Sequence, residues 1–171
     1  AVGWYITSNF SDRIITWSAL SVPHLDAFVY SMRNDKEQIK KSEYIKFFNK
    51  PIFPEIYFKI FSHRNLKNIW SKSSESEIIS YLETFKQRRT LKSALNWYRA
   101  NFRDAESIIG DISVPTLIIY GVNDMAIDVK SVDNSEKFLK GRYKIEKLDS
   151  GHWLIQESFE EVSKSIIKHI N

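Results

Sequence analysis

The segment that most constrains the fold of this chain is the apolar run at residues 115–120, PTLIIY. A short apolar run that ends in the turn-forming residues Gly-Val-Asn-Asp is typical of a strand buried on both faces of a parallel sheet. Residues 13–20 and 143–148 predict two further strands, and residues 131–140 and 158–170 predict helices. This alternation of strands and helices favours an α/β fold with a parallel sheet.

A helical block interrupts the alternation between the first two predicted strands. It is rich in helical patterns, among them a capping box formed by Ser74 and Glu77. The sequence therefore predicts three parts. Residues 1–26 form one piece of the sheet layer, residues 27–108 form an all-helical insertion, and residues 109–171 form the second piece of the sheet layer.

The composition of the chain narrows the classes of function. Its 171 residues are 43% hydrophobic and 27% charged, which fits a folded globular protein. The formal charge of +4 is spread along the chain and no apolar run approaches ~20 residues, so we expect neither a nucleic-acid nor a membrane partner. Without cysteine, a metal-binding motif or a Gly-rich phosphate loop, we expect no metal, no cofactor and a cytoplasmic protein.

Two polar residues follow predicted strands at the place where parallel sheets bind ligands. Asp124 comes shortly after the strand ending at residue 120, and His152 follows the strand ending near residue 148. Because the carboxyl ends of parallel strands meet at one edge of a sheet, the carboxylate can hold the imidazole as a general base. The spacing alone leaves a second interpretation open, namely an ordinary turn aspartate and a loop histidine.

Longer segments around these two residues resemble the α/β-hydrolase family. Residues 114–128, VPTLIIYGVNDMAID, and residues 148–170, LDSGHWLIQESFEEVSKSIIKHI, are similar to the C-terminal third of these enzymes. Residues 1–24 are similar to the helix behind the nucleophile and the strand after it. The resemblance implies the C-terminal part of an α/β-hydrolase sheet with an inserted helical cap. It also implies that Asp124 is the triad acid and His152 the base.

Two motifs in the helical block resemble the cap of soluble-type epoxide hydrolases. Residues 42–51, SEYIKFFNKP, are similar to the family's Y-x-x-x-F-Q-x-P segment, with Asn49 in place of Gln. Residues 95–99, LNWYR, match its L-N-W-Y-R motif. The resemblance implies that Tyr44 and Tyr98 donate their hydroxyl groups to the oxygen of a small-molecule epoxide. Each tyrosine taken alone would also fit plain aromatic packing.

Three more residues are candidates for the substrate pocket. We expect Trp97 and Trp153 to line or support it, and His24 to shape its entrance or to pack locally. The remaining histidines, His63 and His169, are expected at the surface.

The attacking group that the resemblance implies is not found in this chain. No Ser or Asp stands in a G-x-S-x-G or G-x-D-x-G turn, and the family's Asp nucleophile belongs a few residues upstream of Ala1. We therefore expect a piece of an epoxide hydrolase that is inactive alone and that self-associates or pairs with a missing N-terminal segment. The alternatives are a haloalkane or fluoroacetate dehalogenase, another α/β-hydrolase such as an ester hydrolase with a Ser nucleophile, and an inactive binding or assembly module.

Overall fold

The computed structural model describes residues 1–60, 64–102 and 109–171. The chain forms two compact units. The sheet unit combines Ala1–Ser42 with Glu106–Asn171, and the helical unit comprises Glu43–Ala105. The expected division into a sheet layer with a helical insertion has its counterpart in these two units.

The sheet unit is built on three parallel strands in the order β1-β2-β3. They are β1 (Trp17–Leu20), β2 (Thr116–Gly121) and β3 (Tyr143–Leu148). Leu20 is level with Ile119, and Gly121 is level with Leu148, so the carboxyl ends of all three strands lie at one edge. β3 has the predicted bounds, whereas β1 is shorter than the predicted strand 13–20, because its pairing begins where β2 begins, at Trp17 and Thr116.

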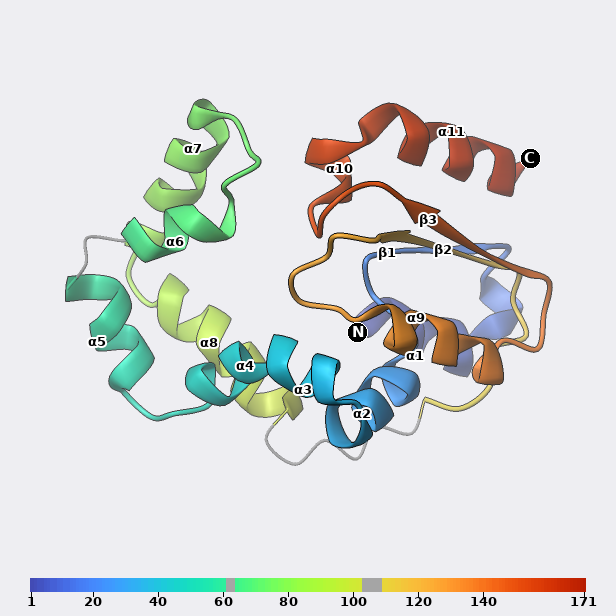
Figure 1. The fold of residues 1–171 in the computed structure, drawn as a ribbon, viewed down its shortest axis with the longest axis horizontal. Coiled ribbons are helices and arrows are strands. Elements are labelled where there is room, and N and C mark those ends of the chain that lie inside the picture. Colours follow the sequence, from blue (N-terminus) through green and yellow to red (C-terminus); the bar gives the residue numbers. More distant parts are fainter. Residues whose placement is uncertain (61–63, 103–108) are drawn as a thin grey trace. The chain divides into compact units, whose positions relative to one another are not determined.

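Helices cover both faces of this sheet (Figure 1). One face carries α10 (Leu154–Glu157) and α11 (Phe159–Ile170), and the other carries α1 (Val2–Asn9), α2 (Leu25–Asn34) and α9 (Val129–Asp133). On the α11 side, Leu117 and Ile119 of β2 are buried against Leu154 and Val162. The helix predicted at 131–140 is instead α9 followed by a 3₁₀ helix, η2 (Asn134–Phe138). A second 3₁₀ helix, η1 (Ser11–Arg13), precedes β1.

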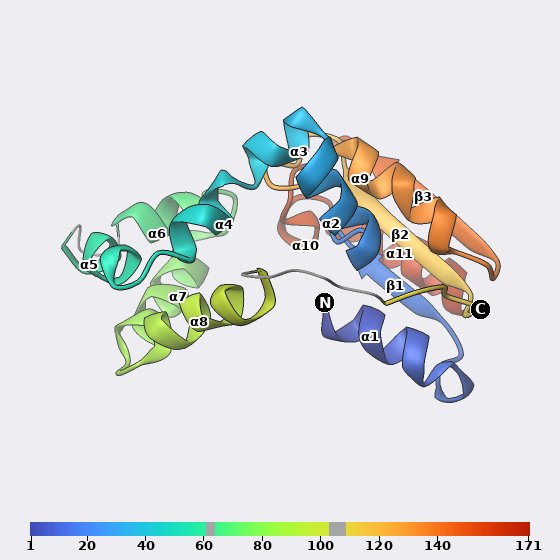
Figure 2. The same ribbon diagram turned by 90° about the horizontal axis from the view of Figure 1, so that it is seen from below.

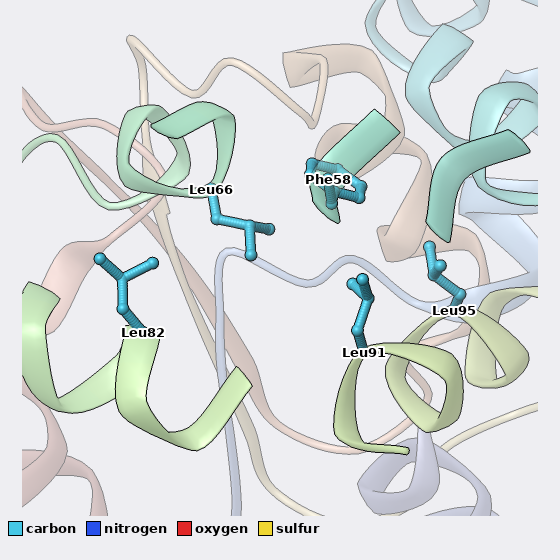
Figure 3. Close-up of a cluster of buried hydrophobic side chains, with 5 residues drawn as sticks. All are labelled: Phe58, Leu66, Leu82, Leu91 and Leu95. Atoms are coloured by element: carbon cyan, nitrogen blue, oxygen red, sulfur yellow. The ribbon is translucent and has the colours of Figure 1, made fainter. Parts of the chain in front are cut away.

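The helical unit contains five helices in the described part of the chain. They are α4 (Glu43–Phe48), α5 (Phe53–Ile60), α6 (Arg64–Ile69), α7 (Glu75–Lys86) and α8 (Thr90–Phe102), and Figure 2 shows them from a second direction. Buried side chains from α5 to α8 point toward one another to form its core (Figure 3); they are Phe58, Leu66, Leu82, Leu91 and Leu95. The predicted capping box at the start of α7 is confirmed, with Ser74 and Glu77 each bonding the other's backbone amide.

The helical unit begins later than the sequence predicted. The expected insertion starts at residue 27, but α2 packs against α9, η2 and α3 (Lys36–Lys41), all of which belong to the sheet unit. The sequences of α2 and α3 have helical patterns like those of the helical unit. The pattern alone therefore does not separate α2 and α3 from the helical unit. The expected end at residue 108 and His63 lie outside the described residues. Within the described ranges, no helix has the length and apolar character needed to cross a membrane.

Candidate active site

The loop after β2 holds Asp124 in a fixed orientation. Its backbone amide donates to the carbonyl of Gly121 at 3.0 Å, which closes the turn. Its carboxylate is buried, and Oδ1 accepts from the amides of Ala126 at 2.7 Å and Ile127 at 2.9 Å. These two bonds leave Oδ2 as the oxygen that is available to a side-chain partner.

That partner is His152, in the loop after β3. Its Nδ1 lies 2.8 Å from Oδ2 of Asp124. Since the carboxylate accepts, Nδ1 carries the proton and Nε2 is left with a lone pair that can take a proton from water. The histidine side chain is about three-quarters buried, and the aspartate side chain is fully buried. The predicted pair is therefore brought together with the geometry of an oriented general base.

Backbone contacts between the strand ends set this distance. Asn123 donates its amide to the carbonyl of Ser150 at 2.9 Å, which ties the acid loop to the histidine loop. The hydroxyl of Ser21, directly after β1, donates to the carbonyl of His152 at 2.9 Å. A side chain on Gly121 would place Cβ only 2.1 Å from the carbonyl oxygen of Gly151, so the two loops can approach only with glycine there.

A buried glutamine on α3 anchors the acid loop from another side. Gln38 is fully buried, and its side-chain amide makes four hydrogen bonds. Its Oε1 accepts from the amide of Asp128 at 2.7 Å and the hydroxyl of Ser131 at 2.8 Å. Its Nε2 donates to the carbonyl of Ala126 and to the hydroxyl of Ser42, both at 2.9 Å. Both polar atoms of this amide are therefore paired, with the loop, with the helix that follows the loop and with Ser42 directly after α3.

Two further side chains contact carbonyl groups of the same loop. The ammonium group of Lys41 donates to the carbonyl oxygens of Asp124 at 2.7 Å and Ile127 at 2.8 Å. The buried hydroxyl of Tyr120 donates to the carbonyl of Ile127 at 3.2 Å. Burial, with the nearby carboxylates of Asp124 and Asp128, raises the pKa of Tyr120 to about 12, so it remains a donor. The sequence did not indicate Gln38 and Lys41, because polar residues on a helix are normally predicted to face solvent.

The two candidate phenol donors lie side by side in the helical unit. The rings of Tyr44 on α4 and Tyr98 on α8 pack edge to face, with centroids 6.0 Å apart. Phe48 packs against both rings, at 5.5 Å from Tyr44 and 4.9 Å from Tyr98. Burial raises the pKa of Tyr98, which keeps its hydroxyl protonated.

Arg99, the residue after Tyr98, connects α8 to α4, to α5 and to the segment between those two helices. Its guanidinium donates to both carboxylate oxygens of Glu55, at 2.7 and 3.0 Å. It also donates to the carbonyls of Phe48 at 3.2 Å and Lys50 at 2.8 Å. This contact lowers the pKa of Glu55 and raises that of Arg99. The two predicted tyrosines thus pack against each other and Phe48, and next to Tyr98 in the sequence Arg99 joins α8 to α4 and α5.

The expected pocket residues occupy three different environments. Trp153 packs edge to face on His152, with ring centroids 5.1 Å apart, so it supports the base. Trp97 on α8 is 48% exposed. His24 is fully buried, where its Nδ1 accepts from the amide of Asp26 as the cap of α2 and its ring stacks on Phe138 at 4.5 Å. Of the two roles expected for His24, the structure shows local packing, and burial in the core lowers its pKa by desolvation.

Comparisons with known proteins place these features in a wider context. No family model matches the chain. Epoxide hydrolase 4 of Homo sapiens is 25% identical over 177 residues, covering 96% of this chain and 49% of that protein. Epoxide hydrolase 3 of Xenopus tropicalis is also 25% identical, covering 96% of this chain and 48% of that protein. The chain thus spans about half the length of the curated relatives it matches.

A comparison of structures supports the same fold. The crystal structure of a Bacillus megaterium epoxide hydrolase in complex with an inhibitor has a TM-score of 0.86 and 21% sequence identity. The match covers 99% of this chain and 65% of that chain. The predicted fold, a parallel α/β-hydrolase sheet with a helical cap, is thereby confirmed.

Proposed function

Because this chain belongs to the α/β-hydrolase family and its curated relatives include epoxide hydrolases, we propose that it carries the base and the epoxide-oxygen donors of an epoxide hydrolase. The observation that carries the proposal is the 2.8 Å contact between Nδ1 of His152 and Oδ2 of Asp124 at adjacent strand ends. The paired phenols of Tyr44 and Tyr98 are the reason why we propose an epoxide as the substrate.

The proposed reaction has two steps. In the first step, a carboxylate supplied from outside these 171 residues attacks an epoxide carbon, the carbon–oxygen bond of the ring breaks, and an alkyl-enzyme ester forms. The hydroxyls of Tyr44 and Tyr98 stabilise the departing alkoxide, which takes up a proton to become the first alcohol. The second alcohol stays masked in the ester until the next step.

The second step regenerates the enzyme. Nε2 of His152 takes a proton from a water molecule, and the resulting hydroxide attacks the carbonyl carbon of the ester. The ester bond breaks, the free carboxylate returns, and the alkoxide leaves with a proton to complete the diol. Asp124 stabilises the imidazolium that forms in between.

The sheet unit also presents an apolar surface that suits a partner. Exposed apolar residues lie in α1 and in the segment before β1, where Ile15 is 89% exposed; the others are Val2, Tyr5, Ile6 and Phe10. Of the strands described, β1 pairs only with β2, so its other edge offers free backbone donors and acceptors. We propose that this surface contacts the remainder of an α/β-hydrolase sheet, or a second copy of the chain.

The test of the epoxide assignment compares paired variants of the protein made from the complete reading frame. With a styrene oxide substrate, the wild type should form the diol. The double variant Tyr44→Phe plus Tyr98→Phe should lose at least about 100-fold in the rate of ester formation, since each oxyanion donor contributes on that order. Thr84→Val on the exposed face of α7 serves as a control. Full activity in the double variant would refute the assignment to epoxides, and halide release from a haloalkane would favour a dehalogenase.

A further inference from the structure

The carboxylate of Glu157 contacts the backbone on both sides of the candidate base. Its Oε2 accepts from the amide of Gly151 at 3.0 Å, and its Oε1 accepts from the amide of Trp153 at 3.3 Å. Gly151 and Trp153 are the two residues that flank His152 in the sequence. One side chain at the end of α10 therefore bridges the whole turn that carries the imidazole.

The bridge leaves little room for other arrangements of this turn. A Cβ on Gly151 would lie 2.7 Å from Oε1 of Glu157, so the carboxylate fills the space that a side chain would need. The hydroxyl of Ser21 donates to the carbonyl of His152 itself. Three consecutive residues of the turn are thus fixed through their backbone atoms, while the imidazole is fixed through Asp124.

We propose that Glu157 is a positioning residue that holds the backbone of the His152 turn so that Nε2 meets the attacking water. The proposal rests on the proposed function, because it assigns Glu157 to the second step of that reaction. Glu157 has no part in the first step, which uses the tyrosines and the attacking carboxylate. Its removal should therefore slow ester hydrolysis while ester formation continues.

A purely structural role makes a different prediction. If Glu157 only stabilised the start of α10, its loss would lower the amount of folded protein and reduce both steps by the same factor. A turn that is free to shift by about 1 Å can cost on the order of 100-fold in the step that depends on its side chain. The ratio of the two rates therefore separates positioning from stability.

The experiment measures both steps in the protein from the complete reading frame. Rapid mixing with excess epoxide, followed by acid quench and intact-protein mass measurement, gives the fraction of enzyme held as the ester. Glu157→Ala should accumulate the ester, with hydrolysis slowed on the order of 100-fold and formation changed less than threefold. Glu157→Gln, which keeps one acceptor oxygen, should be intermediate. Glu160→Ala, an equal charge change at an exposed position on α11, should behave as the wild type.

A second readout does not depend on turnover. The proton on Nδ1 of His152 should give a downfield NMR signal in the wild type, because it is shared with the Asp124 carboxylate. This signal should broaden or move upfield in Glu157→Ala and stay in place in Glu160→Ala. An unchanged signal together with equal loss in both steps would overturn the positioning role. A wild type that forms no ester would instead refute the proposed function, and the NMR signal would still decide the role of Glu157.

Discussion

The two units hold their candidate functional groups in different ways. In the sheet unit, Asp124 and His152 are positioned by a network of polar contacts, most of which involve backbone atoms of two neighbouring loops. In the helical unit, Tyr44 and Tyr98 are positioned by aromatic packing around Phe48. The first arrangement depends on direction as well as distance, whereas the second depends mainly on shape and volume.

This difference leads to different expectations for mutations in the two units. A hydrogen-bonded loop tolerates little substitution, because a buried donor or acceptor without its partner costs about 1–3 kcal/mol. An aromatic cluster can exchange rings of similar size at smaller cost, since volume-conserving changes usually cost less than about 1.5 kcal/mol. We therefore expect the chemistry of the base to be fixed by the sheet unit, and the choice of substrate to be adjustable in the helical unit.

The largest expected effect is that of Asp124→Asn. The asparagine Oδ1 can still accept from the amides of Ala126 and Ile127, so the loop should keep its shape. Its Nδ2, however, would donate to Nδ1 of His152 and impose the wrong tautomer on the base. Diol formation should fall on the order of 10⁴-fold, as expected when an orienting carboxylate is neutralised. Steady-state kinetics on the protein from the complete reading frame, with the thermal midpoint as a control for folding, measure this; residual activity above a tenth of wild type would contradict it.

A second prediction compares a buried polar residue of the sheet unit with a buried apolar residue of the helical unit. Gln38→Met keeps the volume but leaves partners such as the Asp128 amide and the Ala126 carbonyl unsatisfied, so it should cost about 3 kcal/mol of unfolding free energy. Leu95→Ala in the helical unit creates a cavity and should cost about 2–5 kcal/mol. Hydrogen exchange distinguishes them, since only Gln38→Met should speed exchange at the amides of residues 126–128. Equal protection of that loop in both variants would mean that Gln38 does not anchor it.

A smaller effect is expected for the polar cluster around Arg99 in the helical unit. Arg99→Lys keeps the charge beside Glu55 but cannot reach both of its oxygens and the carbonyls of Phe48 and Lys50 at once. We expect a loss of about 2 kcal/mol in unfolding free energy, measured by denaturant titration. The exposed exchange Arg88→Lys, with no such fork of contacts, is the matched control. A loss in Arg99→Lys no larger than in the control would show that aromatic packing alone holds α8 against α4.

The sequence predicted the parts of this fold that depend on local pattern. The buried run at 115–120, the strand at 143–148 and the capping box at Ser74 each carry their own signal and are present in the structure. Asp124 and His152 could be placed at strand ends because parallel connectivity fixes which ends share an edge. Their contact distance could not be predicted, because it depends on how closely two loops pass at Gly121.

The residues that the sequence did not reveal act through long-range contacts. Gln38 bonds residues about 90 positions away in the sequence, and Ser21 bonds the carbonyl of His152 across 131 positions. Nothing in the local pattern of either residue indicates burial. For His24 the sequence left pocket entrance and local packing open, and only the tertiary contacts of its ring with Trp4 and Phe138 decide for packing.

The smallest expected effect is the pH dependence that His24 adds to the stability of the sheet unit. Burial lowers its pKa in the folded state, while in the unfolded chain it should be close to about 6.5. Below that pH the unfolded state takes up a proton that the folded state does not, so stability is full above about pH 6.5 and declines as the pH falls.

His24→Asn retains an acceptor for capping α2 but cannot titrate. The decline in unfolding free energy between pH 7 and pH 5 should therefore be shallower in the variant than in the wild type, although the variant is less stable at pH 7 because it lacks the stack on Phe138. Parallel curves over this range would show that His24 is protonated equally in both states and that its burial does not govern its charge.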